Sequence, residues 1–439
     1  MHKKMTLVWL LLGLGSKLQV IASLSVAEII VLVSVPFVFV KNYQQMKKDG
    51  VMPFFVLSLL VVFGCIVGSV VNHTPSTFVL RGLAVTCLIS GSIVVSHWML
   101  RRDPGGFKWY ILMMPVSAVL STFILKQAVE VAMLGDSAEE IMSGPIFWIG
   151  RLQHLVLAPT KGWYLQTPWP LNVLAPLAVA LFSVMTSISG RSTALAAIGF
   201  GALVIMGGKK RRTISRLSRH FWKICIGGVL LVIAMYYGYK LSASQGWLGE
   251  DARKKYEMQT DGGSGGIGRL ILGGRGDSFI GLLACRDKPI VGWGPWAMDE
   301  NGYAEEFIEK YGTWEDVEEM IRMREWRAKY GITMRLLSCH AYITEFWAWY
   351  GVFGLVFILY IVFVLLRYLK QDVAAVPQWY AWLACSIPGM LWAVFFSPFA
   401  DRFGIPLMIV ACLMARAVRK GKFQLPIEMI REIERAERS

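Results

Sequence analysis

Residues 336–360 read LLSCHAYITEFWAWYGVFGLVFILY, and the character of the chain changes within them. A polar segment, residues 242–340, ends at His340, and an apolar run follows that continues to residue 366. A helix needs about 20 apolar residues to cross a bilayer core of roughly 30 Å. The run is therefore expected to span a membrane, with His340 at its water-facing mouth.

The composition of the whole chain is that of a polytopic membrane protein. Of its 439 residues, 55% are hydrophobic and 17% are charged, and the mean hydropathy is +0.50. Soluble domains carry about 25% charged residues, so an ordinary soluble fold is excluded. The formal net charge is +15. Lys and Arg form short clusters at the ends of apolar runs instead of one basic face, which argues against nucleic acid as a partner.

Eleven apolar runs are candidates for membrane spans. They cover residues 5–19, 21–40, 51–71, 79–100, 109–126, 168–187, 192–208, 221–241, 341–366, 378–397 and 403–417. Five basic connectors, residues 41–48, 101–108, 209–223, 367–370 and 416–422, adjoin these runs. Because Lys and Arg concentrate on the cytoplasmic side of membranes, all five connectors are expected to face inward.

The stretch 141–159 decides the number of spans. Two inward connectors are joined by an even number of crossings, but only three clear runs lie between connectors 101–108 and 209–223. Taking residues 141–159 as a span gives twelve, with both termini inside. Its Arg151 and His154 would then have to face other helices or water, because an arginine at mid-bilayer costs roughly 2.5–3.5 kcal/mol. The alternative of eleven spans places connector 209–223 outside, against the charge rule.

The predicted fold is an all-α polytopic membrane protein with about twelve transmembrane helices and one large outer loop. Residues 1–241 hold nine spans, residues 242–340 form the loop, residues 341–417 hold three spans, and residues 418–439 form a cytoplasmic tail helix. Within the loop, residues 303–330 are strongly charged with apolar residues at helical spacing. This pattern predicts one or two amphipathic helices on the membrane surface.

Seven cysteines show no spacing typical of metal ligands. Two of them, Cys285 and Cys339, belong to the outer loop. An oxidising compartment would permit a disulfide between them, and free thiols are the alternative.

Three segments on the expected outer side carry residues suited to anion and proton chemistry. Arg191 lies in a Ser-Gly-Arg-Ser reversal between two spans, Arg275 precedes an apolar turn and the Pro-x-x-Gly-x-Gly bend at 289–294, and His340 heads a helix with Gly-x-x-Gly at 351–354. Arginine binds phosphate oxygens in a bidentate manner, and histidine titrates near neutral pH. Taken singly, each residue has a structural alternative as an interfacial anchor or a loop ion pair.

In order and spacing, these segments resemble the O-antigen ligase and O-antigen polymerase superfamily of bacterial membrane enzymes. The resemblance covers residues 167–367 in motifs and the whole chain in the number of spans. Two positions depart from the family pattern. Ala341 follows the histidine where members usually have asparagine, and Phe279 stands four residues after the loop arginine where tryptophan is frequent.

The resemblance implies a GT-C-like glycosyltransferase in the bacterial inner membrane, with its active site facing the periplasm. Such an enzyme moves a glycan from undecaprenyl diphosphate to a hydroxyl of a glycolipid or glycan acceptor, such as lipid A-core in lipopolysaccharide biosynthesis. Inversion at the anomeric carbon and independence of metals and other cofactors are expected. An O-antigen or exopolysaccharide polymerase is the first alternative. A transporter of polysaccharide lipids is the second, disfavoured because the sequence shows no paired halves.

The resemblance also assigns roles to individual residues. Arg275 and Arg191 are expected to hold the diphosphate leaving group, whose developing charge cationic donors stabilise, and His340 to act as the base for the acceptor hydroxyl. Further candidates for contacts with the diphosphate or glycan are Arg269, Arg402, Arg81, Asp277 and Glu345. Glu345 is expected either to orient the imidazole or to act as the base itself.

Overall fold

The computed structural model describes residues 2–16, 18–21, 24–125, 155–186, 210–245, 247, 276–311, 337, 339, 341–397 and 401–438. These residues are mostly helical, as expected for an all-α protein. A short antiparallel pair, β1 (Gln19–Ile21) and β2 (Leu24–Ser25), follows the first helix.

The helices of the described residues follow the predicted spans closely. They are α1 (His2–Gly15), α2 (Val26–Asp49), α3 (Met52–Val71), α4 (Ser76–Arg102), α5 (Phe107–Leu125), α9 (Trp169–Thr186), α11 (Arg211–Arg219), α12 (Phe221–Ser244), α15 (Gly276–Asp287), α16 (Tyr303–Tyr311), α18 (Tyr342–Arg367) with its π-helical continuation η1 (Tyr368–Asp372), α19 (Pro377–Phe396), α20 (Gly404–Arg419) and α21 (Ile427–Arg438). Within residues 418–439, where a tail helix is predicted, α21 is the helix observed.

Four helices are long and apolar enough to cross a membrane: α2, α3, α4 and the combined α18 and η1. Shorter apolar helical segments cover Met5–Gly15, Phe107–Leu120 and Pro170–Val179. The chain is therefore consistent with an all-α membrane protein. The predicted span 192–208 and residues 141–154, with Arg151 and His154, lie outside the described residues, so the number of twelve spans stays a prediction.

The second predicted span differs in its bounds. It was expected at residues 21–40, but α2 begins at Val26 and runs through the basic connector to Asp49. Ser25 accepts the backbone N–H of Glu28, and Glu28 accepts the backbone N–H of Ser25, which is a capping box that sets the start of the helix. Gly50, with φ 80°, ends the helix in the left-handed conformation that glycine adopts without strain.

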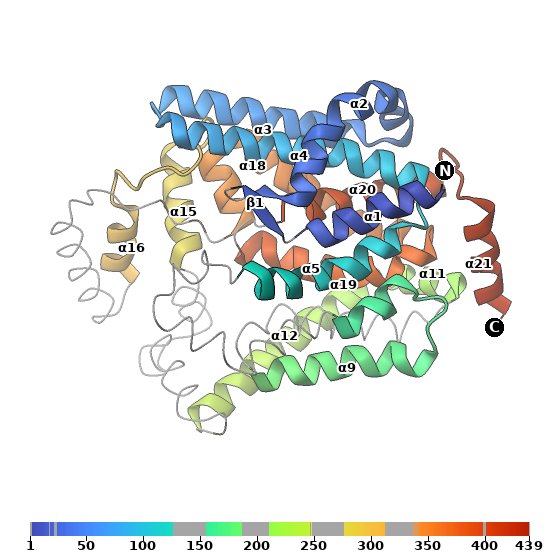
Figure 1. Cartoon of the computed structure of the whole chain (residues 1–439). Coiled ribbons are helices and arrows are strands. Elements are labelled where there is room, and N and C mark those ends of the chain that lie inside the picture. The colour runs from blue at the N-terminus through green and yellow to red at the C-terminus, as the bar shows by residue number, and fades with distance from the viewer. Residues whose placement is uncertain are drawn as a thin grey trace.

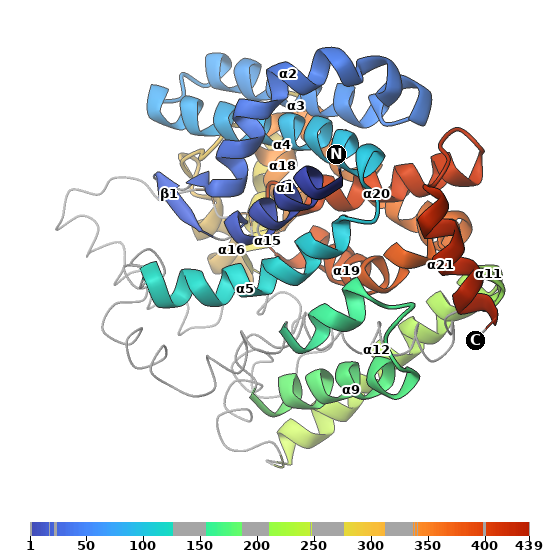
Figure 2. The same ribbon diagram turned by 45° about the vertical axis from the view of Figure 1, so that its right-hand side comes forward.

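The helices form layers in which distant parts of the chain lie side by side. Helices α2, α3 and α4 lie along one side, and α18 and α20 lie next to them (Figure 1). Helices α5 and α19 lie in the middle, with α9 and α12 on the opposite side (Figures 1 and 2). Helices α15 and α16 stand at one end, here called the loop end. Helices α11 and α21 and both chain termini stand at the other, called the basic end.

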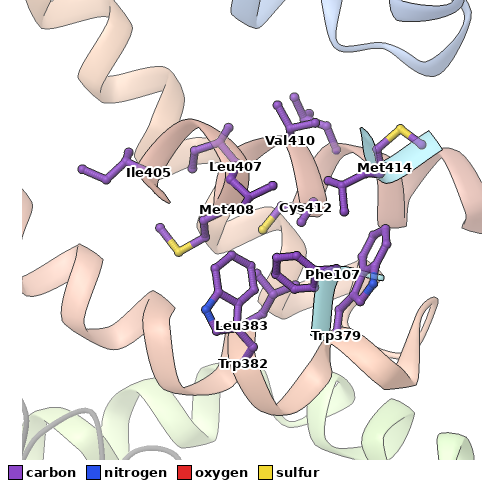
Figure 3. Close-up of a cluster of buried hydrophobic side chains, with 14 of the residues drawn as sticks. Phe107, Trp379, Trp382, Leu383, Ile405, Leu407, Met408, Val410, Cys412 and Met414 are labelled. Atoms are coloured by element: carbon purple, nitrogen blue, oxygen red, sulfur yellow. The ribbon is translucent and has the colours of Figure 1, made fainter. Parts of the chain in front are cut away.

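Packing at the centre is dense because α20 is apolar all round. Every residue of α20 from Ile405 to Ala415 is buried, as expected for a helix enclosed by others. Figure 3 shows these side chains against Trp379 and Trp382 of α19 and Phe107 of α5. The rings of Phe107 and Trp382 meet edge to face, with their centroids 4.6 Å apart. Such close van der Waals packing is the main force between helices where lipid surrounds them.

The basic connectors gather at the basic end. The guanidinium of Arg101 lies 5.4 Å from the ring centroid of Phe423, and the amino group of Lys370 lies 5.8 Å from the ring of Trp222. These contacts bring the ends of α4, α12, η1 and α20 together.

A buried polar network connects α2 to α4 at the basic end. His97 is fully buried, and its Nε2 lies 2.9 Å from a carboxylate oxygen of Asp49, which also binds Arg101. The other ring nitrogen of His97 lies 2.8 Å from the amide nitrogen of Asn42. All five connectors expected on one side of the membrane thus meet at one end of the molecule.

Helix α18 is broken at Gly351, where φ is 62° and ψ is −148°. The loop segment 289–296 fills the break: the carbonyl of Ala348 accepts the N–H of Trp293 at 2.6 Å, and the N–H of Val352 donates to the carbonyl of Ile290 at 3.0 Å. A similar bond of 3.1 Å joins the N–H of Gly294 to the carbonyl of Trp349. Backbone groups freed in a membrane protein must find such partners within the protein.

Substitution of Gly351 by alanine tests the importance of this break. A Cβ there would stand 2.0 Å from the carbonyl oxygen of Ile290, at a positive φ. We expect Gly351→Ala to lower the free energy of unfolding in detergent micelles by more than about 2 kcal/mol. Gly227→Ala on α12 is the matched control, because its Cβ would meet nothing within 4 Å. That control should be neutral or stabilise by up to about 1 kcal/mol. Equal effects of the two substitutions would contradict the prediction.

Candidate functional site

Four predicted site residues, Arg191, Arg269, Arg275 and His340, lie outside the described residues. The chain on both sides of His340 is described, at Cys339 and Ala341, and Gly276, which follows Arg275 in the sequence, begins α15. The positions of these neighbours show which parts of the protein surround the candidate site.

Helix α15 packs on the first turns of α18 because one face of α15 carries small residues. A Cβ at Gly281 would stand 2.9 Å from Sγ of Cys339 and 3.1 Å from Cβ of Thr344, so only glycine permits this approach. One turn further on, Sγ of Cys285 lies 3.9 Å from the carbonyl oxygen of Thr344. The segment that follows Arg275 in the sequence is thus in direct contact with the segments that flank His340.

The charges of carboxylates from three segments act on Cys339. Burial raises the pKa of the Cys339 thiol well above its ordinary value, and the charges of Glu345, Asp277 and Asp299 act in the same direction. Glu345 is buried in the first turn of α18, and Asp277 lies in the first turn of α15. Two predicted contact residues, Asp277 and Glu345, thus both act on Cys339, which precedes His340 in the sequence. Within the described part of the chain, these side chains are not grouped as a metal site.

Cys285 and Cys339 are free thiols rather than a disulfide. Both are buried, and burial raises the pKa of Cys285 to about 12. Because the thiolate is the reactive form of cysteine, neither residue is suited to be a nucleophile. Both act as small side chains that permit close packing.

Arg402 is held by a residue that the sequence analysis did not single out. Its Nη1 lies 3.5 Å from Oε1 of Glu28, and the two side chains are 20% and 9% exposed. The second carboxylate oxygen of Glu28 accepts the N–H of Ser25 at 2.7 Å. The charges of Arg402 and Glu345 both act on Tyr350 of α18. The Ser-x-x-Glu pattern at 25–28 is a sequence signal that would have revealed Glu28.

Arg81 is exposed on α4, and its neighbour Gly82 faces Pro295 of the loop. In the described part of the chain, Arg81 forms no ion pair. Its predicted contact with substrate remains a prediction.

Lys288 is a second residue that sequence reasoning missed. Its amino group donates a hydrogen bond to the side-chain oxygen of Asn72 and lies 3.6 Å from the ring centroid of Trp293. The amide of Asn72 donates in turn to the carbonyl oxygen of Gly292 at 3.0 Å. Cation–π contact and hydrogen bonding thus fix the lysine where α3 ends and the loop enters the break in α18. The sequence signal that points to Lys288 is its position directly before the Pro-x-x-Gly-x-Gly bend.

Helix α16 is tied to α15 by polar contacts. The Tyr303 hydroxyl donates to Asp287 at 2.6 Å and, together with Arg286, lowers the pKa of that carboxyl. Asp299 accepts the N–H groups of Tyr303 and Ala304 and so caps α16. The described start of the charged segment 303–330 is helical as predicted. The remainder of that segment lies outside the described residues.

No family model, curated protein or solved structure matches this chain. Carboxylates act on Cys339, which precedes His340 in the sequence, and cations are held at Arg402 and Lys288. Such a setting suits proton transfer next to a bound anion.

A double-mutant cycle tests whether Glu28 fixes Arg402. Glutamine at position 28 preserves the capping box, so Glu28→Gln, Arg402→Gln and the double variant isolate the charge interaction. We expect a coupling free energy of about 1–2 kcal/mol from unfolding in micelles, because the pair is mostly shielded from solvent.

The pair Arg286–Glu306 provides the control for this cycle. Its charged atoms are 3.6 Å apart, but its side chains are 59% and 43% exposed. Solvent screening should leave no measurable coupling there. The same coupling in both cycles would show that burial of Glu28 and Arg402 has no effect.

Proposed function

We propose that this protein is a membrane glycosyltransferase of the O-antigen ligase type. It moves a glycan from undecaprenyl diphosphate to a hydroxyl of lipid A-core or a similar acceptor. One observation supports the proposal above the others: loop 289–294 fits into the break of α18 at Gly351. In consequence, helix α15, which follows Arg275 in the sequence, packs against helix α18, which follows His340. A single site that uses both residues requires this proximity.

In the proposed topology twelve helices cross the inner membrane in a GT-C-like arrangement. The basic end lies in the cytoplasm, and the loop end lies in the periplasm. Support comes from the five basic connectors, which meet at one end, as the distribution of Lys and Arg across membranes requires.

In the proposed reaction the acceptor oxygen forms a bond to the anomeric carbon as the bond from that carbon to the diphosphate oxygen breaks. The bonding electrons leave with the diphosphate, and the hydroxyl proton passes to His340. Arg275 and Arg191 stabilise the charge that grows on the diphosphate. Attack from the opposite face inverts the configuration. In this proposal Glu345 orients the imidazole or takes the proton itself, and Arg402 is a further cation for the diphosphate.

The transporter alternative also has a structural argument, because broken helices are common in transporters. In α18, however, the freed backbone groups bond to loop 289–296 instead of lining a substrate cavity. The described carboxylates and cations of the candidate site lie toward the loop end and not at the middle of the helices. This arrangement favours the enzyme.

Transfer of glycan by the purified protein tests the proposal. With donor and acceptor supplied in detergent, Arg275→Ala and His340→Ala should each reduce transfer at least about 100-fold. Arg286→Ala, at an exposed arginine of the same loop, should retain full activity. Activity should also persist in a chelator.

Full transfer by His340→Ala would refute the assignment of the base. Chain growth without acceptor would identify a polymerase, and movement of donor without a new glycosidic bond would identify a transporter.

Labelling from outside the cell tests the span count, which decides whether Arg191 shares a side with His340. With twelve spans, Ser192→Cys should react with a membrane-impermeant maleimide in intact cells. Glu300→Cys, exposed at the loop end, should react likewise, and Gln424→Cys, exposed at the basic end, should react only after permeabilisation. If Ser192→Cys behaves like Gln424→Cys, Arg191 cannot belong to the site.

A further inference from the structure

Four cations gather at the basic end, and three of them act on one buried carboxylate. Arg367 ends α18, Arg416 and Arg419 lie in the last turn of α20, and Lys420 follows them. We call these four residues the cation cluster. Asp372 of η1 is 2% exposed and binds Arg419, and the charges of Arg367 and Arg416 also act on it. One negative charge therefore stands against four positive charges.

The excess positive charge is not neutralised by the described residues. Arg367, Arg416 and Lys420 form no ion pair within the described part of the chain, and Nε of Arg367 is buried without a hydrogen-bond partner. The pKa of Lys420 is lowered, chiefly by the charge of Arg416, which reflects like charges held close together. Such crowding is unfavourable unless an anion from outside the chain joins the cluster.

An apolar surface leads along α18 to the cation cluster. Its exposed residues recur at steps of three or four and so lie on one face of the helix; they are Val352, Val356, Leu359, Phe363 and Leu366. The guanidinium of Arg367 lies 5.9 Å from the ring centroid of Phe363. Beyond it, the exposed ring of Trp222 lies under Lys370. The surface therefore passes from apolar residues to a tryptophan and then to cations. A membrane protein contacts acyl chains, the interface and head groups in the same order.

We propose that the cation cluster binds the phosphate of an anionic phospholipid, with an acyl chain along the exposed face of α18. Arginine forks match phosphate oxygens in pairs, and the apolar face favours a lipid over a free phosphate. The bound lipid would join the end of α18 to the end of α20. This inference does not depend on the proposed glycosyltransferase activity.

Native mass spectrometry of the full chain in detergent tests the proposal, with phosphatidylglycerol or phosphatidylcholine added as the probe. The wild type should bind phosphatidylglycerol with at least about tenfold higher affinity than phosphatidylcholine. The variant Arg367→Gln/Arg416→Gln/Lys420→Gln leaves the Asp372–Arg419 pair intact. It should lose roughly a hundredfold in affinity for the anionic lipid. Should that variant fail to fold, Lys420→Gln, at an exposed position, should lose about fivefold.

The matched control removes three exposed charges from α21 at the same end of the molecule. Arg431→Gln/Arg435→Gln/Arg438→Gln should retain the lipid preference, because glutamates alternate with these arginines. Unchanged binding in the cation-cluster variant, or equal loss in the control, would overturn the proposal. Glycerol phosphate should compete weakly. Full competition at the same concentration would identify a free-phosphate site and overturn the assignment to a lipid.

Discussion

The break in α18 is the constraint on which the loop end depends. A helix in a membrane satisfies its backbone groups internally, and a residue with left-handed φ interrupts that pattern. At Gly351 the lost bonds are replaced by bonds to loop 289–296. The loop cannot leave without exposing backbone groups of both segments, so α15 and α16 are attached to the membrane bundle. Glycines at 292 and 351 are required because each backbone closely approaches the other.

Buried ion pairs connect different helices at the two ends of the molecule. At the basic end, Asp49 binds His97 and Arg101, and Asp372 binds Arg419, so each carboxylate joins the ends of two helices. Toward the loop end, Glu28 joins the start of α2 to the turn before α20. A buried charge in a membrane protein is costly without a partner. These pairs therefore specify which helix ends meet, and they leave positive charge in excess at the basic end.

The difference in charge between the loop end and the basic end is compatible with the proposed transfer reaction and with the proposed lipid site. The loop end combines carboxylates that act on Cys339 with cations held by Glu28 and Asn72. The basic end presents arginines and lysines next to an apolar helix face. Helix α18 connects the two ends, since it carries Glu345 near its start and Arg367 at its end. Its packing against α3 and α20 is thus important for both sites.

From the sequence alone follow the helical class, most helix bounds and the grouping of basic connectors. Hydropathy and charge act locally, because each segment must suit the lipid or water around it. Sequence also pointed to Asp277, Glu345 and Arg402 as candidates, but not to Glu28 or Lys288. Only the tertiary structure decided the break of α18, the pairing of Glu28 with Arg402 and the free state of the two loop thiols. These features depend on contacts between residues far apart in the chain, which hydropathy and spacing do not encode.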